Sequence, residues 1–531
     1  MTSTPRGVLP ALALVSLLGL AGCLSPEQRM ALKVENFMDR QQYEPALRYL
    51  DGYLSKHSKS LNGWRYRVLI RLEQGERAEA AAEYVALEDA LARHEPEVLR
   101  EVVLGGGGRW LLSDYRALAR CANAGVADAA FFADLLEPKL LSEGSMSKVA
   151  VPDDEVAAVL DALPGRLAPS ETWPLVERYW ERGSDELRVR VTRAAGRHLA
   201  SEGLTTKQEP EAKAILLEAA ASQQGALREA ALLGAQSLPE ARAGLGAEVV
   251  GALVQQGDVK RALSGFLLGP RGQGPAGWSV ETLSSWAETA QEPVRVLAVA
   301  TLIGREQGQA SAGRVALLDR AATSDDVATR LAAVAAAPLA PGWRSAPDAE
   351  ATWSALSVEQ KRAWGPVFVR SAAPDAGAWA TRVLGDTDAL VVEQGALALA
   401  LPGAGSDPAV DAALTVAMEG DPSARAAAAA AAVVRGADTL GNPVGALLAN
   451  GDDRATEAVL TALRDTGRAG WDAAVTLGMQ SPVPTTRELA VDAAVATCDP
   501  GRTEQMFTLL SDEDPHVAVR AASALYLLIG G

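Results

Sequence analysis

Near its end the chain reads Ser511-Asp-Glu-Asp-Pro515-His-Val-Ala-Val-Arg520-Ala-Ala-Ser-Ala-Leu525-Tyr-Leu-Leu-Ile529. Asp514 and Pro515 predict a turn that opens a helix, because proline is tolerated in the first helical turn, where an N–H has no intrahelical partner. The apolar residues after this turn are spaced at i, i+4, i+7, i+8 and i+11, so they share one helix face; they are Val517, Ala521, Ala524, Leu525 and Leu528. We therefore expect an acidic turn followed by a packed helix.

The same pattern recurs upstream at a nearly constant interval. A central Arg or Glu marks each copy, and successive markers lie on average about 33 residues apart, a period typical of helical repeats. The markers are Arg190, Arg228, Arg261, Arg295, Arg330, Arg362, Glu393, Arg425, Glu457, Arg487 and Arg520. Repeats of this length indicate a solenoid, in which each unit buries its apolar face on its neighbours.

These copies resemble the second helix of a HEAT repeat, in which an acidic turn precedes Val-x-x-Arg-x-x-Ala-x-x-Ala-Leu. The resemblance covers residues 166–531 and implies an all-α fold, an alpha-alpha superhelix of the HEAT/armadillo-like class with about eleven units. It implies no particular activity. The recurring Arg residues and the Asp residues before them are interpreted as ladders between neighbouring repeats and as helix caps, in preference to a binding stripe.

A different repeat precedes this array, within residues 23–100. Ala46 and Ala80 are separated by one period of a helical repeat, about 34 residues, and Trp64 and Tyr84 accompany them. Trp64, Ala80 and Tyr84 stand where a tetratricopeptide repeat carries its Trp, its small Ala and its aromatic residue, so the segment resembles that family. One and a half such units cannot bury their own faces and are expected to pack on helices later in the chain. Residues 101–165 are interpreted as bridging helices, with a glycine joint at 105–108.

The first 22 residues have the pattern of a secretory signal, with Arg6 followed by an apolar run of about a dozen residues, too short to span a membrane. The run ends in Leu20-Ala-Gly-Cys23, which resembles the lipobox of bacterial lipoproteins. That resemblance implies cleavage before Cys23, acylation of its thiol and amino group, and a lipid-anchored protein of the cell envelope. Leu24 follows the cysteine, and by the enteric sorting rule this favours the periplasmic side of the outer membrane.

The net charge of the chain excludes some classes of binding partner and favours others. The 531 residues carry 50 basic and 67 acidic side chains, a formal net charge of −17, and 48% of them are hydrophobic. A chain this acidic is not expected to bind nucleic acid, which requires a basic face. Its field instead favours basic protein partners and speeds their encounter.

Residues with the spacing of catalytic or metal sites are scarce. The four His residues are scattered singly, so we expect no metal and no cofactor. No nucleophile elbow appears, and we expect no catalytic residues and no enzyme activity. Cys121 and Cys498 stand far apart in the sequence; two buried free thiols are favoured, with a disulfide as the alternative in an oxidising compartment.

Two features suggest surfaces for a partner. Trp278 and Trp343 lie beside loops rich in Pro and Gly, so they are candidate contacts on the rim of the solenoid, although core packing explains most of the 11 Trp residues. The last helix lacks a polar capping repeat. Tyr526, Leu527 and their neighbours therefore either fold back onto the preceding repeat or form a docking surface.

The sequence predicts a lipid-anchored scaffold or adaptor that binds proteins along its solenoid. An accessory or lyase-type HEAT protein that positions a substrate is the alternative, and a purely structural spacer is a third hypothesis. A convergent polar pocket would favour the accessory role, and a smooth open groove would favour the scaffold.

Overall fold

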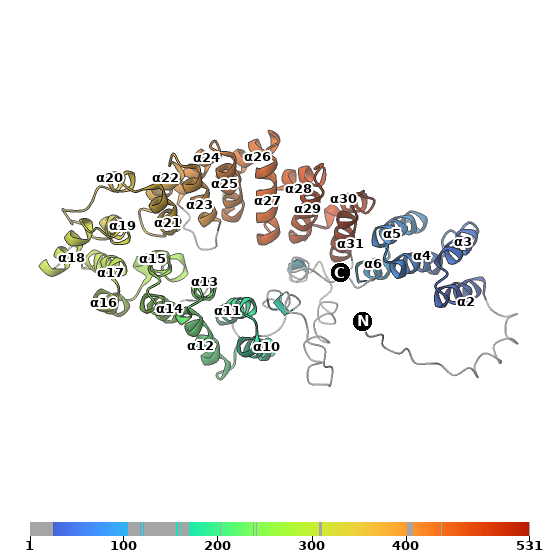
Figure 1. Cartoon of the computed structure of the whole chain (residues 1–531), viewed down its shortest axis with the longest axis horizontal. Helices are drawn as coiled ribbons and strands as arrows, with labels where there is room; N and C mark the ends of the chain where they lie inside the picture. The colour runs from blue at the N-terminus through green and yellow to red at the C-terminus, as the bar shows by residue number, and fades with distance from the viewer. Residues whose placement is uncertain are drawn as a thin grey trace. The chain divides into compact units, whose positions relative to one another are not determined.

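A computed structural model confirms the predicted all-α class. It describes residues 25–104, 117, 120–121, 156–157, 160, 169–201, 203–236, 238–239, 242–306, 311–400, 407–436 and 438–529. Within these ranges the chain forms 27 α-helices and no strand, and neighbouring helices pack as in an alpha-alpha superhelix (Figure 1). None of the helices in the same ranges is long and apolar enough to cross a membrane.

The helices group into two compact units, which we describe separately. Unit 1 comprises residues 1–109 and 501–530, and unit 2 comprises residues 110–500. The helices of unit 1 are α2 (Pro26–Asp39), α3 (Tyr43–Leu54), α4 (Leu61–Gln74), α5 (Arg77–Leu91), α6 (Pro96–Leu104), α30 (Thr503–Leu509) and α31 (Pro515–Ile529).

Unit 2 consists of helix pairs. Its first helices are α10 (Pro169–Arg182), α12 (Gln208–Ala221), α14 (Ala243–Gln255), α16 (Val280–Thr289), α18 (Ala312–Ala322), α20 (Ala349–Ser354), α22 (Ala376–Leu384), α24 (Pro408–Ala417), α26 (Gly441–Ala449) and α28 (Asp472–Met479). Its second helices are α11 (Asp185–Ala200), α13 (Gly225–Gln236), α15 (Val259–Leu268), α17 (Glu292–Arg305), α19 (Val327–Ala336), α21 (Val358–Val369), α23 (Ala389–Leu399), α25 (Pro422–Arg435), α27 (Asp453–Thr466) and α29 (Pro484–Ala496).

The repeat markers fall where the periodicity placed them. Every one of the eleven lies in a second helix, from Arg190 in α11 to Arg520 in α31. Second helices of successive repeats pack side by side, most extensively α23 with α25 and α25 with α27. The approach is closest between α11 and α13, where a Cβ added to Gly196 would lie 2.5 Å from the Cα of Gly234.

The array of unit 2 turns back on itself after α19. The 3-10 turn η6 (Ala337–Leu339) and the short helix α20 follow α19, and the next second helix, α21, packs against α15. The N–H of Ala372 donates to the carbonyl oxygen of Leu267 at 3.1 Å, and the Lys260 ammonium lies 5.5 Å from the ring centre of Trp364. These contacts join segments that are separated by three repeats in the sequence.

A disulfide joins Cys121 to Cys498 within unit 2. The expectation of two free thiols was therefore wrong. The physical reason is that the segment around Cys121 docks on the ends of α27 and α29: Arg120 donates to the carbonyl oxygens of Arg464 (2.9 Å) and Asp465. Docking brings the Cα atoms of the two cysteines to 5.1 Å, within the normal range for a disulfide.

In unit 1 the tetratricopeptide-like helices cover the last helix of the chain. Both α5 and α6 pack on α31, and the Phe507 ring stacks on His94 at a centroid distance of 5.0 Å. Ala80 and Tyr84 are fully buried. The last two helices thus belong to the same compact unit as residues 25–104.

Candidate functional site

One face of α23 carries the clearest exposed apolar feature of unit 2. This helix is flanked by α21 and α25 and backed by α22 and α24, which leaves one face that no described helix covers. Leu390 and Leu397 lie on this face at i and i+7, and 45% and 49% of their surfaces are exposed. Gln394, between them, is also exposed. Two large apolar side chains so accessible on one helix face make this face a candidate interaction surface.

The neighbouring helix α25 extends this surface with small side chains. Ala426 and Ala430 are only half-buried, while most other alanines of the helix are buried. We refer to Leu390, Leu397, Ala426 and Ala430 as the inner strip. Acidic side chains border it, namely Glu393 on α23 and Glu457 on α27, where Glu457 accepts a hydrogen bond of 2.8 Å from the Thr486 hydroxyl. The inner strip is therefore an exposed apolar surface that includes Gln394 and has Glu393 and Glu457 on the neighbouring helix turns.

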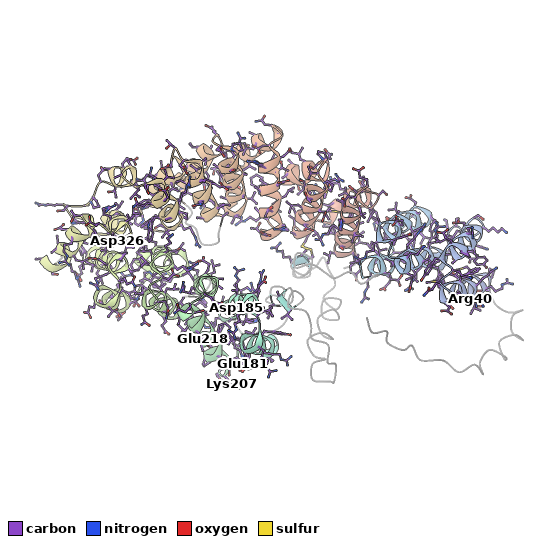
Figure 2. The ribbon with its side chains drawn as sticks, in the orientation of Figure 1. Arg40, Glu181, Asp185, Lys207, Glu218 and Asp326 are labelled. Carbon is purple, nitrogen blue, oxygen red and sulfur yellow. A yellow bond between two sulfur atoms is a disulfide. The ribbon has the colours of Figure 1, made fainter. Side chains whose placement is uncertain are left out.

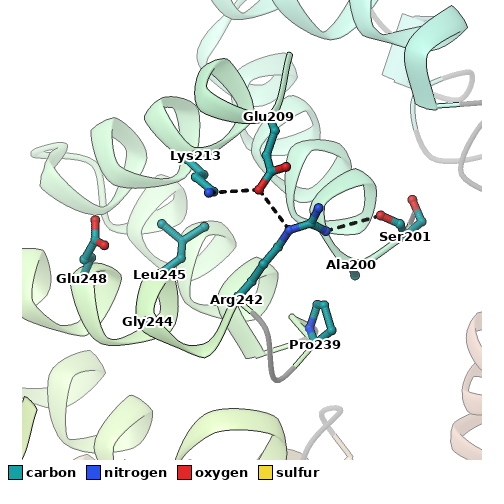
Figure 3. Close-up of a pocket in the computed structure, with 9 residues that line it drawn as sticks. All are labelled: Ala200, Ser201, Glu209, Lys213, Pro239, Arg242, Gly244, Leu245 and Glu248. Atoms are coloured by element: carbon teal, nitrogen blue, oxygen red, sulfur yellow. Dashed lines mark hydrogen bonds and ion pairs between the residues drawn. The ribbon is translucent and has the colours of Figure 1, made fainter. Parts of the chain in front are cut away.

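A polar hollow of about 620 Å³ lies between α12, α14 and the end of α11 (Figure 3). Glu209 accepts hydrogen bonds from Lys213 at 2.9 Å and from Arg242 at 3.2 Å, and these bonds lower the pKa of its carboxyl group. Arg242 also donates to the carbonyl oxygens of Leu199 and Ser201 (3.4 Å), at the end of α11. These charged side chains pair with one another and connect the three helices, so their role is structural.

A second hollow, of about 410 Å³, lies beside α26. Glycines form one wall, because a Cβ built on Gly441 or Gly445 would meet nothing within 4 Å. Trp471, half-buried, and Arg468, exposed, form part of the opposite wall. The hollow is shallow and open to solvent.

The recurring Arg residues have structural roles, as the sequence suggested. Arg228, Arg362 and Arg425 each pair with an Asp that caps the next second helix, at 2.7, 2.8 and 3.0 Å. Others, such as Arg295 and Arg487, donate to a carbonyl oxygen just before their own helix begins. These contacts satisfy backbone groups that helix ends leave without partners.

Three of the four candidate partner contacts are buried, and the fourth is half-buried. Trp278 is 4% exposed, donates to the carbonyl oxygen of Phe266 at 3.0 Å and meets Trp286 edge-on, so its expected rim position was wrong. Trp343 is half-buried and donates to the Asp319 carboxylate at 2.9 Å. Tyr526 and Leu527 are buried in unit 1. Cys23 lies outside the described residues.

The inner strip was missed because the helix around Glu393 was used only as a repeat marker. Its sequence does carry a signal: Val391, Val392, Ala396 and Leu399 form the buried set, so Leu390 and Leu397 make the helix apolar on its other side too. A surface helix that is apolar on all sides cannot bury every side against its neighbours. A second apolar face is then available for a partner.

Among the described residues no group of three or more potential metal ligands comes together. Burial lowers the pKa of His198 to about 4, so this side chain is neutral at pH 7. In sequence, neither a protein-family model nor a curated protein matches the chain.

Proposed function

We propose that the protein is a bacterial lipoprotein, anchored through Cys23, that acts as a non-catalytic scaffold or adaptor at the cell envelope. Its partner is a protein segment with apolar side chains and net positive charge, which lies along the inner strip. The observation that carries this proposal is the pair Leu390 and Leu397, about half exposed on a helix face of the repeat array that no described helix covers.

Energetics and charge support a segment of this kind. Burying a fully exposed Leu side chain contributes roughly 1.5–3 kcal/mol, and covering a half-exposed one contributes about half of that. Leu390, Leu397 and the neighbouring alanines can therefore bind a short apolar segment weakly, with additional contacts from its flanking residues. The bordering Glu393 and Glu457 and the chain's net charge of −17 favour basic flanking residues. The disulfide agrees with an oxidising compartment outside the cytoplasm.

A substrate-positioning role is less well supported. In the polar hollow beside α12, Glu209 pairs with both Lys213 and Arg242, so three of the four charged side chains of its lining are committed to internal contacts, and Glu248 is the fourth. A substrate would have to displace contacts that hold α11, α12 and α14.

Charge placed on the inner strip should prevent partner binding. A photo-crosslinking residue at position 394 should capture the partner in the intact protein, and the double variant Leu390→Glu, Leu397→Glu should lower the yield at least 10-fold. The cause is the cost of burying two carboxylates against an apolar surface. The matched control is Val416→Glu, Leu477→Glu, at exposed positions of the first helices α24 and α28. Equal yields from the two double variants would contradict the proposal.

The anchor is tested separately by Cys23→Ala. This variant should incorporate no radiolabelled palmitate and should leave the membrane fraction, because the acylated thiol is lost. Leu24→Asp serves as the control, since it should remain lipidated and, in an enteric host, move from the outer to the inner membrane fraction. Labelling that survives Cys23→Ala would exclude the lipoprotein assignment.

A further inference from the structure

The helices that follow Cys23 have the opposite charge to the rest of the chain. From Pro26 to Gln74, the segment that holds α2, α3 and α4 contains nine Lys or Arg and six Asp or Glu, a net charge of +3. The whole chain carries 50 basic and 67 acidic residues, so the remainder has 41 basic and 61 acidic residues, a net charge of −20. A local reversal of this size gives the N-terminal helices their own electrostatic preference.

Half of the acidic side chains of this region are occupied by protein partners. Glu27 accepts hydrogen bonds from Ser60 and Asn62 at 3.2 and 3.1 Å, and Glu35 accepts one of 2.6 Å from the Tyr66 hydroxyl. Asp51 pairs with Arg67. Three basic side chains of the segment are likewise held in ion pairs, Arg65 with Glu101, Arg67 with Glu83 and Arg71 with Glu76. Outside these contacts the segment keeps six basic and three acidic side chains, so its surface charge remains positive.

The basic side chains of α2 point outward instead. Arg29, Lys33 and Arg40, the C-cap residue, are exposed, and none forms an ion pair within the described ranges. Lys33 lies over the Tyr49 ring at 4.4 Å, a contact that leaves its charge uncompensated. Figure 2 shows Arg40 at the outer edge of the blue helices.

These residues share one side of the helix with an exposed leucine. Counted from Arg29, Leu32, Lys33 and Arg40 follow at i+3, i+4 and i+11, which is a single helical stripe. Half of the Leu32 surface is exposed, while Met30 and Val34 face the core of unit 1. We call Arg29, Leu32, Lys33 and Arg40 the basic stripe.

We propose that the basic stripe binds the surface of an anionic phospholipid membrane, with Arg29, Lys33 and Arg40 on lipid phosphates and Leu32 at the boundary of headgroups and acyl chains. Lys and Arg close to an anionic bilayer are attracted to it, and an apolar side chain among them adds burial. The inference rests on the proposed lipid anchor for its setting, since α2 begins at Pro26, close behind Cys23. Binding by the stripe would hold α2 flat beside the anchor.

The experiment uses the unlipidated chain from Leu24 to Gly531, which contains every described residue. Its partitioning is measured by sedimentation with mixed phosphatidylcholine–phosphatidylglycerol vesicles in a 7:3 ratio, and with pure phosphatidylcholine vesicles, at 0.1 M NaCl. We expect binding only to the anionic vesicles and its loss at 0.5 M NaCl, because salt screens the attraction. The triple variant Arg29→Gln, Lys33→Gln, Arg40→Gln should lower the partition coefficient by about 10- to 100-fold, and Leu32→Gln several-fold.

The matched control removes three exposed basic residues of unit 2, in the variant Arg320→Gln, Arg344→Gln, Arg468→Gln, and should bind as the parent chain does. Equal binding to both kinds of vesicle, or an equal loss in the control variant, would overturn the inference. Because the chain used here carries no lipid, the result is independent of the Cys23→Ala test. Palmitate labelling with no vesicle binding refutes the stripe alone, and vesicle binding without labelling refutes the anchor alone.

Discussion

Replacing Leu527 by Glu should unfold unit 1. Leu527 is 1% exposed on α31, in the helix that α5 and α6 cover. The substitution removes a buried leucine, which typically costs about 2–5 kcal/mol, and places a carboxylate in an apolar site without a partner. The sum approaches the whole free energy of unfolding of a typical domain, about 5–15 kcal/mol. Limited proteolysis of the full chain should then cleave first within residues 25–104 and 501–529.

Leu32→Glu provides the control for this experiment. Leu32 is an exposed leucine of the same unit, so the same change of side chain should leave the melting temperature and the cleavage pattern nearly unchanged. A Leu527→Glu protein that resists protease as the parent does would show that the end of α31 is not covered in solution. In that case the C-terminal helix would again be a candidate docking surface.

The last helix illustrates how far the sequence predicts this fold. The Asp-Pro turn and the apolar spacing predicted a helix that starts at Pro515, and α31 does start there, with Val517, Ala521 and Leu525 buried. The same pattern could not identify what covers Tyr526 and Leu527 on the other side. Their cover is the segment α5–α6, near the opposite end of the chain, and local periodicity holds no information about contacts at that distance.

The repeat array of unit 2 likewise has local contacts that the sequence predicts and distant contacts that it does not. The regular spacing of the markers placed every second helix correctly, because each repeat must bury its face on the next. The return of α21 onto α15 depends on one short helix, α20, and on a hydrogen bond from Ala372 to Leu267. The loop before α20 is rich in Pro and Gly, but this composition does not say which distant helix α21 will meet.

The surface residues were predicted least well. Trp278 was chosen because loop tryptophans often mark interfaces, yet the aromatic ring packs on Trp286 in the core. Leu390 and Leu397 were not singled out, because only Glu393 of their helix served as a repeat marker. Which face of an apolar helix stays uncovered depends on the helices around it, and their arrangement is known only once the array has folded.

Reduction of the disulfide should strongly destabilise unit 2. The bond between Cys121 and Cys498 closes a loop of 377 residues, and the loop-entropy model gives a contribution of about 6 kcal/mol for a loop of this length. The melting temperature of the oxidised protein should therefore fall by several degrees on addition of a reducing agent. Thiol titration of the denatured chain from Leu24 should find no free thiol before reduction and two after it.

Two cysteine variants separate the bond from the packing around it. Cys121→Ala loses the disulfide, and Cys498→Gly loses it while relieving a backbone with φ of +54°, a left-handed conformation that glycine adopts freely. Both should melt at the same temperature with and without reductant, and Cys498→Gly should be the more stable by about 1 kcal/mol. If the parent chain is insensitive to the reductant and shows two reactive thiols from the start, Cys121 is not bonded to Cys498, and the segment at Cys121 is held to the ends of α27 and α29 by other contacts, among them those of Arg120.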